Sequence, residues 1–460
     1  MRRPIVAGIV VVVALIIGAT FYFVGMNAIR RAFTDRRPPV AEYAPQTAPE
    51  GAVFTPAPTD WPAFRGPGGT GISTAGKPPT EWAADKNLAW RVELPGSGAS
   101  SPIVVGNLVI VLAYSGGNGK EPLARTIVAY NSDSGKQEWE YRPETTHTED
   151  GYNGFLTEHG YASSTPASDG KHIVAMLGKS GVVCLSMTGK ELWRAATGTM
   201  SANRRWGSAA SPIIVGDLVV VNAAEEARAL IAFDLATGQH VWKSEGAALE
   251  LSYGTPVLTR NSKGEDELLL GVPDEIWSIH PRTGKLRWHI NAPLPGNVSP
   301  SPAVANDLVL IQGGYPSTTL VAAPLGGHGK LPADAIRWQT GVASYVPSGL
   351  VHDGHFYCVT DKGLAVCLEA ATGAVKYQER FDIKGAESRS KPVYASLVLA
   401  DGHLYAVTRK AGVFVYAVGT SFSKPSVMKL GEGEDFSATP AISGNSMFLR
   451  SDTALYCVRH

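Results

Sequence analysis

Residues 231–242 read Ile231-Ala232-Phe233-Asp234-Leu235-Ala236-Thr237-Gly238-Gln239-His240-Val241-Trp242, and the chain repeats this pattern. Each copy has a glycine in a predicted turn and an aromatic residue four positions after it. The glycines are Gly135, Gly189, Gly238, Gly284 and Gly373, and the aromatic residues are Trp139, Trp193, Trp242, Trp288 and Tyr377. A pattern that returns at a regular spacing indicates a repeat architecture.

A second landmark with the same spacing is a proline that usually follows Ser or Thr. It occurs at Pro102, Pro166, Pro212, Pro256, Pro302, Pro347, Pro392 and Pro440. The intervals are 64, 46, 44, 46, 45, 45 and 48 residues, so the period is about 45 with one insertion of about 19 in the first copy. The chain therefore contains eight copies of one unit.

Each unit is predicted to form four short strands. Residues 211–222 hold two β-branched runs around a Gly-Asp turn, residues 229–235 form a third run, and residues 239–243 form a fourth. Such a sheet buries both faces only when neighbouring sheets stack on it, so the sequence predicts an all-β, eight-bladed β-propeller.

The ring also needs to close. Residues 87–92 include Trp90 and resemble the outer strand of a blade with nothing before it, whereas the last copy ends at residues 457–460 without such a strand. We therefore expect the N-terminal strand to complete the last blade, which removes the open sheet edges that favour aggregation.

The residues before the propeller fall into three predicted segments. Residues 5–26 carry no charged side chain and are long enough to span a bilayer, so residues 1–31 are predicted to be a transmembrane anchor. Residues 32–59 are rich in proline and are predicted to be an extended linker. Residues 60–86 are predicted to form an irregular head segment on the propeller surface, and residues 87–460 to form the propeller.

Composition and charge fit a globular protein. The chain has 460 residues, 44% of them hydrophobic and 18% charged, with a formal net charge of zero. This composition supports a large buried core, and the neutral balance argues against nucleic acid as a partner.

The repeat allows a family resemblance to be stated. The pattern Ala-x-Asp-x-x-Thr-Gly-x-x-x-Trp, best preserved at residues 232–242, resembles the pyrroloquinoline-quinone (PQQ) type of propeller repeat. Residues 61–67, together with Trp90, are similar to the start of a bacterial group of PQQ-binding-like propellers. The resemblance implies either a quinoprotein dehydrogenase or a non-enzymatic scaffold, such as the propeller lipoprotein of the outer-membrane β-barrel assembly machinery. Fold-level similarity does not choose between them.

The cysteines argue against the dehydrogenase. The resemblance implies adjacent cysteines over the quinone, a metal site and an Asp base, but Cys184, Cys358, Cys367 and Cys457 are never adjacent. We therefore expect no cofactor, with PQQ and calcium as the alternative. The chain also has no Cys-x-x-Cys-His sequence for covalent haem and no Leu-x-x-Cys sequence typical of a lipoprotein before the propeller.

The cysteines also have a structural interpretation. Cys184, Cys367 and Cys457 occupy the small-residue position of their repeats, so they are predicted to pack beside the next blade. Cys358 and Cys367 flank one hairpin turn. A two-residue turn would place them opposite each other for a disulfide, whereas a glycine bulge would offset them.

The insertion between Trp139 and Pro166 is rich in groups that can bind metals. It contains His147, Glu149, Asp150, Glu158 and His159. The spacing of the two histidines matches no helical or hairpin ligand pattern, so we predict a solvated loop across one face and no metal site.

The candidate binding surface lies at the rim of the central channel. The connection that precedes each inner strand enters this rim, and the connections carry Tyr161, Arg204, Arg205, Trp206, Tyr253, Tyr345, Arg389 and Phe436. Aromatic residues among arginines suit a planar, anionic or sugar-like ligand, or a loop of a partner protein. The alternative is that these side chains only fill the channel. No catalytic residue is predicted.

The sequence thus predicts a membrane-anchored, non-enzymatic propeller that binds proteins or glycans, with a PQQ-dependent dehydrogenase as the alternative. A carbohydrate-active propeller is a second alternative and needs two carboxylates facing each other in the channel. The rim offers Glu250, Glu387, Glu432, Glu434 and Asp435.

The predicted location is a single-pass inner-membrane protein with its propeller in the periplasm, because propellers of the resembling group are usually exported. A count of arginines gives the opposite orientation. Arg2 and Arg3 precede the predicted anchor, whereas Arg30, Arg31, Arg36 and Arg37 follow it.

Overall fold

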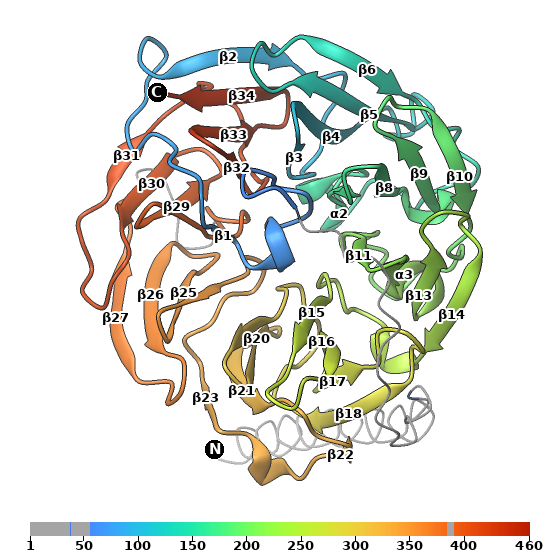
Figure 1. The fold of residues 1–460 in the computed structure, drawn as a ribbon, viewed down its shortest axis with the longest axis vertical. Helices are drawn as coiled ribbons and strands as arrows, with labels where there is room; N and C mark the ends of the chain where they lie inside the picture. Colours follow the sequence, from blue (N-terminus) through green and yellow to red (C-terminus); the bar gives the residue numbers. More distant parts are fainter. Residues whose placement is uncertain (1–36, 38–55, 384–390) are drawn as a thin grey trace, which may run out of the picture.

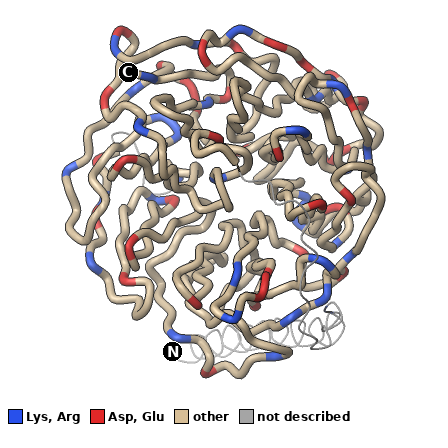
Figure 2. Tube along the Cα trace, viewed as in Figure 1, with Lys and Arg blue, Asp and Glu red and all other residues tan. Residues whose placement is uncertain are grey.

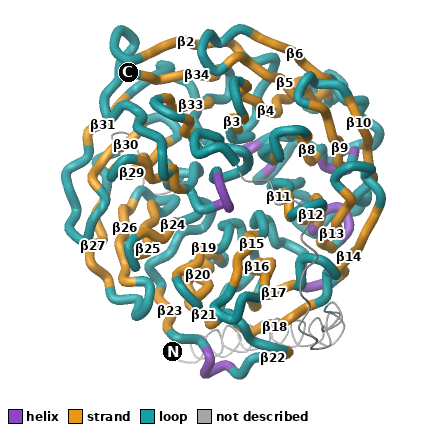
Figure 3. The backbone as a smooth tube through the Cα atoms, viewed as in Figure 1, coloured by secondary structure: helices purple, strands orange, loops and turns teal. Residues whose placement is uncertain are grey.

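The computed structural model describes residue 37, residues 56–383 and residues 391–460. Their strands form eight sheets arranged radially around a central axis (Figure 1). This arrangement confirms the predicted all-β, eight-bladed propeller. The few helices are single turns in the loops (Figure 3): η1 (Pro67–Gly69), α2 (Leu156–His159), η2 (Gly178–Ser180), α3 (Ala224–Ala227), η3 (Ala247–Leu249) and η4 (Ala333–Ala335).

The first four blades follow each other in chain order. Blade 1 is β3 (Ile103–Val105), β4 (Leu108–Ser115), β5 (Ala124–Asn131) and β6 (Gln137–Tyr141). Blade 2 is β7 (Ala167–Ser168), β8 (His172–Met176), β9 (Val182–Ser186) and β10 (Glu191–Ala195). Blade 3 is β11 (Ile213–Val215), β12 (Leu218–Ala223), β13 (Ala229–Asp234) and β14 (His240–Glu245). Blade 4 is β15 (Val257–Arg260), β16 (Asp266–Val272), β17 (Glu275–Ile279), β18 (Leu286–Asn291) and the added β22 (Gly329–Lys330).

The last four blades include two strands from the N-terminal region. Blade 5 is β19 (Ala303–Ala305), β20 (Leu308–Gly313), β21 (Thr319–Pro324) and β23 (Trp338–Thr340). Blade 6 is β24 (Leu350–His352), β25 (His355–Val359), β26 (Leu364–Glu369) and β27 (Val375–Arg380). Blade 7 is β28 (Val398–Ala400), β29 (His403–Thr408), β30 (Gly412–Ala417) and β31 (Ser426–Met428), with β1 (Ile72–Ser73) added parallel to β28. Blade 8 is β32 (Ala441–Ser443), β33 (Ser446–Arg450), β34 (Ala454–Arg459) and β2 (Leu88–Glu93).

Blade 8 closes the ring in the predicted way. Strand β2 pairs antiparallel with β34, and Trp90 lies opposite Cys457. The predicted anchor at residues 5–26 and most of the linker lie outside the described residues. Among the residues that are described, no helix is long and apolar enough to cross a membrane.

The repeated tryptophan and glycine are explained by contacts between neighbouring blades. A side chain at Gly238 would meet the Trp193 ring at 2.5 Å, and Gly238 has φ +72°, so the position requires glycine. The Trp193 indole N–H also donates to the Leu235 carbonyl at 2.9 Å. The same indole-to-carbonyl bond joins Trp90 to Ser132, Trp139 to Met187, Trp242 to Pro281 and Trp338 to Ala370.

Two tryptophans depart from the predicted pattern. Trp338 takes the repeat position in blade 5, but the long connection from β21 to β23 hides it from the sequence pattern. The Trp288 indole N–H donates instead to the buried Glu267 carboxylate at 2.6 Å. In this blade a side chain therefore takes the place of the backbone carbonyl that accepts from the other repeat tryptophans.

The cysteines lie opposite the repeat aromatic residues. Cys184 is opposite Trp193, and Cys367 is opposite Tyr377. Cys184, Cys367 and Cys457 are each buried in a cluster shared with the following blade, as predicted. The core is thus divided among the interfaces between blades.

A disulfide between Cys358 and Cys367 is excluded by register. Cys358 lies opposite Val366, whereas Cys367 lies opposite Tyr357. Residues one position apart in a strand pair point to opposite faces, so the two thiols face different neighbouring blades. Both are free and buried.

A ring of hydroxyl residues joins the inner ends of the blades. Its members are Ser101, Thr165, Ser211, Thr255, Ser301, Ser348, Ser396 and Thr439. The backbone N–H of each residue donates to the hydroxyl of the next at 2.9–3.0 Å, in seven of the eight links. The remaining link, from Thr255 to Ser301, is missing. The Ser301 hydroxyl has no hydrogen-bond partner within the described chain.

The hydroxyl ring corrects the predicted proline spacing in two blades. In blades 6 and 7 the ring residues are Ser348 and Ser396, which do not precede a proline. The inner strand β28 begins at Val398, six residues after Pro392. Pro392 therefore belongs to the connection between the blades and does not start a strand.

Candidate functional site

One mouth of the central channel is covered by residues 60–77, here called the plug segment (Figure 1, blue). Trp61 exchanges backbone hydrogen bonds with Val104 of β3 at 2.7 and 2.9 Å. The segment continues into β1, which pairs with β28, and Lys77 N–H donates to the Gly444 carbonyl at 2.9 Å. The plug segment is thus attached to blades 1, 7 and 8 through the backbone.

Arg65 lies in the centre of the plug segment and is only 1% exposed. Its guanidinium donates to the carbonyl oxygens of Gly349 and Thr70 and makes no ion pair among the described residues. Burial lowers the pKa of Arg65 to about 10. The charge of Arg65 is therefore held by backbone dipoles at this mouth.

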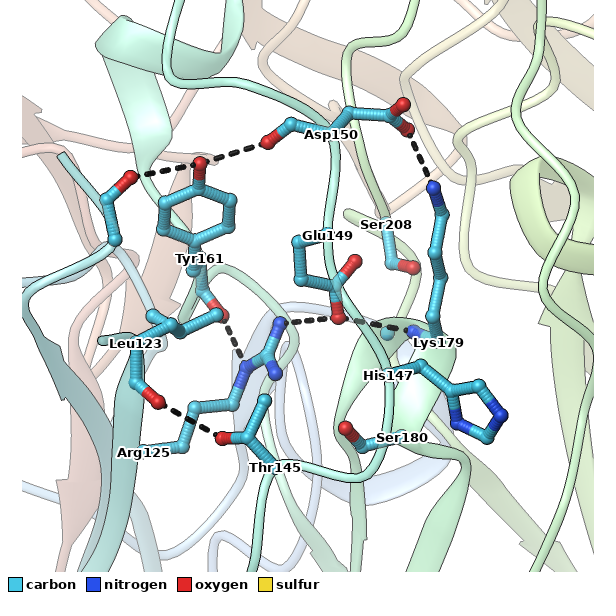
Figure 4. Close-up of polar contacts among 12 residues, drawn as sticks. Leu123, Arg125, Thr145, His147, Glu149, Asp150, Tyr161, Lys179, Ser180 and Ser208 are labelled. Carbon is cyan, nitrogen blue, oxygen red and sulfur yellow. Dashed lines mark hydrogen bonds and ion pairs between the residues drawn. The ribbon is translucent and has the colours of Figure 1, made fainter. Parts of the chain in front are cut away.

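The opposite mouth, here called the rim face, is covered by the insertion, residues 142–162. The Arg125 guanidinium contacts the Glu149 carboxylate at 2.8 Å, and Lys179 Nζ lies 3.1 Å from the Asp150 carboxylate (Figure 4). All four side chains are nearly buried, with exposed fractions of 4–11%. The insertion lies across one face as predicted, and residues 144–148 and 151–154 are exposed, but Glu149 and Asp150 form buried ion pairs with blades 1 and 2.

The far end of the insertion reaches blade 7. Helix α2 lies near the channel axis (Figure 3), and its Glu158 carboxylate accepts from Arg409 at 2.7 Å. Arg409 also contacts the Asp435 carboxylate at 2.6 Å. The insertion thus spans the rim face, held at both ends by ion pairs.

The two coverings enclose a central cavity of about 130 Å³. Phe64 of the plug segment lines it from one side, and Phe155 and Glu158 of the insertion line it from the other. Its wall contains six members of the hydroxyl ring: Ser101, Ser211, Thr255, Ser348, Ser396 and Thr439. Trp206, Tyr253 and Tyr394 complete the aromatic part of the lining.

Aromatic rings continue from the cavity to the surface of the rim face. Phe155 lies 5.1 Å from Trp206 and 6.2 Å from Tyr345, measured between ring centroids. Tyr315 lies 5.8 Å from Tyr345 and is 52% exposed. These contacts connect the insertion to blades 3, 5 and 6.

Two cations lie on these rings. Lys391 Nζ is 3.7 Å from the Tyr345 ring centroid, and the Arg204 guanidinium is 5.7 Å from that of Trp206. Such distances allow cation–π attraction. We call Arg204, Trp206, Tyr315, Tyr345 and Lys391 the rim cluster.

The structure brings together some of the predicted rim residues and separates others. Trp206 and Tyr253 line the cavity, and Tyr345 and Arg204 lie in contact with its aromatic lining. Arg205 is exposed beside them, with φ +52°. Arg389 lies outside the described residues.

Tyr161 and Phe436 are the two predicted residues that lie elsewhere. The Tyr161 hydroxyl donates to the carbonyl oxygens of Asp150 and Gly117, so this side chain holds the insertion against blade 1 (Figure 4). Phe436 is 7% exposed and packs on Tyr456 in the core beside blade 8.

Four residues of the site escaped the sequence analysis. Tyr394 was missed because Pro392 was taken as the start of a strand, which ended the connection too early. Lys391 lies in the predicted connection, where Arg389 was chosen instead. Phe155 lies in the insertion, whose path no repeat predicts. Tyr315 comes from the β20–β21 connection, whereas the search covered only the connections that precede inner strands.

A pair of buried acids lies beneath the rim face on α3. The Tyr253 hydroxyl donates to the Glu225 carboxylate at 2.6 Å, and burial raises the pKa of Glu225. Glu226 is 2% exposed and accepts from Ser208, and burial raises its pKa to about 8. This pair could not be predicted from the repeat, because α3 lies in the β12–β13 connection of blade 3 and is not repeated in the other blades.

Comparison with known proteins assigns the chain to a family. The family model described as outer membrane protein assembly factor BamB matches residues 73–149, 127–331 and 329–421. The chain belongs to this BamB family. No curated protein matches the chain.

Solved structures show the same fold as this BamB-family member. BamB from Moraxella catarrhalis superimposes with a TM-score of 0.55 at 12% identity, over 81% of this chain and 97% of that one. The quinohemoprotein alcohol dehydrogenase from Comamonas testosteroni gives 0.56 at 11% identity, over 89% and 81%. A europium-containing methanol dehydrogenase gives 0.59 at 13% identity, over 85% and 89%. At such identities the similarity establishes the fold alone.

The carboxylates of the site are already engaged. Glu158 is the one carboxylate among the described residues that line the cavity, and it pairs with Arg409. Of the acids predicted at the rim, Glu250 contacts Arg228, Glu434 contacts Arg91, and Asp435 contacts Arg409. Glu432 does not line the cavity, and Glu387 lies outside the described residues. The described lining of the cavity thus holds one carboxylate, whereas glycoside hydrolysis usually requires two that flank the scissile bond.

Proposed function

We propose that this BamB-family propeller is a non-enzymatic binding protein whose rim cluster holds a protein partner. The main supporting observation is the difference between a small internal cavity and a rim face rich in aromatic and cationic groups. The cavity has about 130 Å³, below the 300–1,000 Å³ typical of sites that enclose a small organic ligand. Binding at the surface is therefore favoured over binding inside the channel.

The residues of the cavity do not fit PQQ. This cofactor is a planar, fused-ring tricarboxylate, which needs an extended flat slot and several cations. The wall consists mainly of hydroxyl and aromatic side chains, and no Lys or Arg is among the described residues that line it. Within the described ranges, no group of three or more His, Cys, Asp or Glu is arranged to hold a metal ion.

A titration tests the dehydrogenase alternative. The full chain, purified in detergent, is titrated calorimetrically with PQQ in calcium and then assayed for dye-linked oxidation of alcohols and sugars. We expect neither saturable heat nor turnover. Saturable binding together with turnover would replace the proposed function by a quinoprotein dehydrogenase.

Photo-crosslinking tests the proposed protein partner directly. A photoreactive amino acid is placed at Tyr315 on the rim face, and a control at Lys171, an exposed residue in the β7–β8 turn at the plug end. In bacteria that produce the full chain, we expect discrete crosslinked protein bands from position 315 and none shared with position 171. If position 315 yields no band above the control, the proposal fails.

We also propose that residues 5–26 anchor the chain in the inner membrane and that the propeller lies in the periplasm. The support is the uncharged 22-residue stretch, which is long enough for a membrane-spanning helix. Protease added to spheroplasts should digest the propeller while leaving cytoplasmic proteins intact. Protection until the cells are lysed would place the propeller in the cytoplasm.

A further inference from the structure

We infer that the rim cluster binds an acidic segment of a partner protein, through Arg204 and Lys391. This inference rests on the proposed function and specifies the chemistry of the partner.

The two cations lie over two rings that both neighbour Phe155. Lys391 Nζ lies over Tyr345 at 3.7 Å, and the Arg204 guanidinium lies over Trp206 at 5.7 Å. Neither cation makes a hydrogen bond or ion pair within the described part of the chain. Arg204 is exposed and Lys391 is partly buried, so both retain donors that an incoming group can use.

The acids that face Lys391 are occupied by other partners. Glu158 pairs with Arg409 at 2.7 Å. Asp361 is 4% exposed and accepts the backbone N–H of Tyr345 at 3.2 Å. The rim cluster itself contains two cations and no carboxylate, and the side chains of Glu158 and Asp361 are already hydrogen-bonded to other groups. Elsewhere on the propeller, positively and negatively charged residues lie interspersed around the ring (Figure 2).

The arrangement of the rings favours carboxylate side chains over a planar ligand. Lys391 covers Tyr345, which is only 5% exposed, and Trp206 is in contact with Phe155 and Tyr253. A planar base, quinone or sugar would need an exposed ring face for stacking. What remains accessible is the two cations and Tyr315, which is 52% exposed.

These groups match a peptide that combines acidic and aromatic residues. Carboxylates of such a segment would form charge-assisted hydrogen bonds with Arg204 and Lys391. An apolar or aromatic side chain would pack on Tyr315. Because the site is partly exposed, its attraction for acids is expected to weaken with salt.

Fluorescence anisotropy tests this inference with a defined probe. The probe is a labelled peptide of about twelve glutamates and tyrosines, and the control peptide has glutamine in place of glutamate. With the full chain in detergent, we expect the glutamate peptide to bind at least about tenfold more tightly than the glutamine peptide. Raising NaCl from about 50 to about 500 mM should weaken the binding by about tenfold.

Matched charge reversals locate the binding site. The double variant Arg204→Glu with Lys391→Glu should weaken peptide binding by at least about tenfold. The control, Lys171→Glu with Lys285→Glu, makes the same change in net charge at two exposed turns away from the rim cluster. It should leave binding within about twofold. Thermal unfolding verifies that each variant is folded, and Arg204→Gln with Lys391→Gln should give an intermediate loss.

Three results would overturn the inference. They are equal binding of the two peptides, an equal loss in the control double variant, or binding of an anionic polysaccharide such as polygalacturonate without binding of the glutamate peptide. If the crosslinks from position 315 persist in the charge-reversed variant, the inference fails while the proposed function stands. If position 315 gives no crosslinks at all, the proposed function fails.

Discussion

The two mouths of the channel are covered by different kinds of contact. The plug segment is attached through backbone hydrogen bonds, strand pairing and the buried side chains Trp61 and Arg65. The rim face is held by side-chain ion pairs from the insertion and leaves Tyr315 and Arg204 accessible. Backbone pairing fixes a structure, whereas accessible side chains can exchange partners. The comparison therefore assigns stability to the plug segment and binding to the rim face.

Trp61→Ala is expected to give the largest effect. Trp61 is 1% exposed and belongs to the core shared by blades 1, 7 and 8, so its truncation should lower the free energy of unfolding by about 3–5 kcal/mol. Tyr315→Ala on the rim face should change it by less than about 0.5 kcal/mol, because Tyr315 is 52% exposed. Denaturant unfolding measures both values, and similar losses would contradict the division between the mouths.

Glu226→Gln should change how stability depends on pH. The native pKa of Glu226 is about 8, above the ordinary value of 4.5, because burial disfavours the charged form. The native state therefore keeps a proton that the unfolded chain has released, and the resulting stability is fully present below about pH 4.5 and is lost as pH rises through 8. The substitution should be nearly neutral at pH 5 and should stabilise by a few kcal/mol at pH 8.5.

The measurement for Glu226 is thermal unfolding of both proteins at several pH values. The wild-type stability should fall more steeply between pH 5 and 8.5 than that of the variant. Parallel curves would show that the Glu226 carboxyl is not held in its neutral form beneath the rim face.

The hydroxyl ring provides a matched pair of serines. The Ser348 hydroxyl accepts the Ser301 N–H at 2.9 Å, so Ser348→Ala leaves a buried donor unsatisfied and should cost about 1–3 kcal/mol. The Ser301 hydroxyl has no partner within the described residues, so Ser301→Ala should cost less than about 0.5 kcal/mol. Chemical denaturation measures the free energy of unfolding of the two variants. Equal losses would show that the hydrogen bonds of the hydroxyl ring do not contribute to stability.

The sequence predicted what the repeat determines. Gly238 and Trp193 could be predicted because the same contact recurs between blades. Trp90 revealed the closure of the ring because its strand was extra at the N-terminal end, whereas the last copy lacked an outer strand. The predicted start of blade 7 failed at Pro392 because a proline there mimics the repeat without its preceding hydroxyl.

The rim was predictable only where the repeat fixes its position. Trp206 and Tyr253 come from connections of ordinary length and do line the cavity. The insertion has no counterpart in other blades, and its bond from Glu158 to Arg409 joins residues 251 positions apart. Such contacts depend on the closed ring and leave no local pattern, so Phe155 could not be placed from the sequence.

Glu158→Gln is expected to have the smallest effect on stability and gives the sharpest test of the comparison. Its pair with Arg409 is partly exposed, at 36% and 26%, and such pairs contribute about 0–1 kcal/mol, while Arg409 keeps its contact with Asp435. Losing the pair should nevertheless free the α2 end of the insertion, because Glu158 is the residue that ties this end to blade 7. Amide hydrogen exchange should therefore become faster in residues 155–160 and stay unchanged in residues 60–77, where backbone pairing holds the chain. If exchange in residues 155–160 does not change, the aromatic contacts of Phe155 hold the insertion by themselves, and the rim face is as fixed as the plug segment.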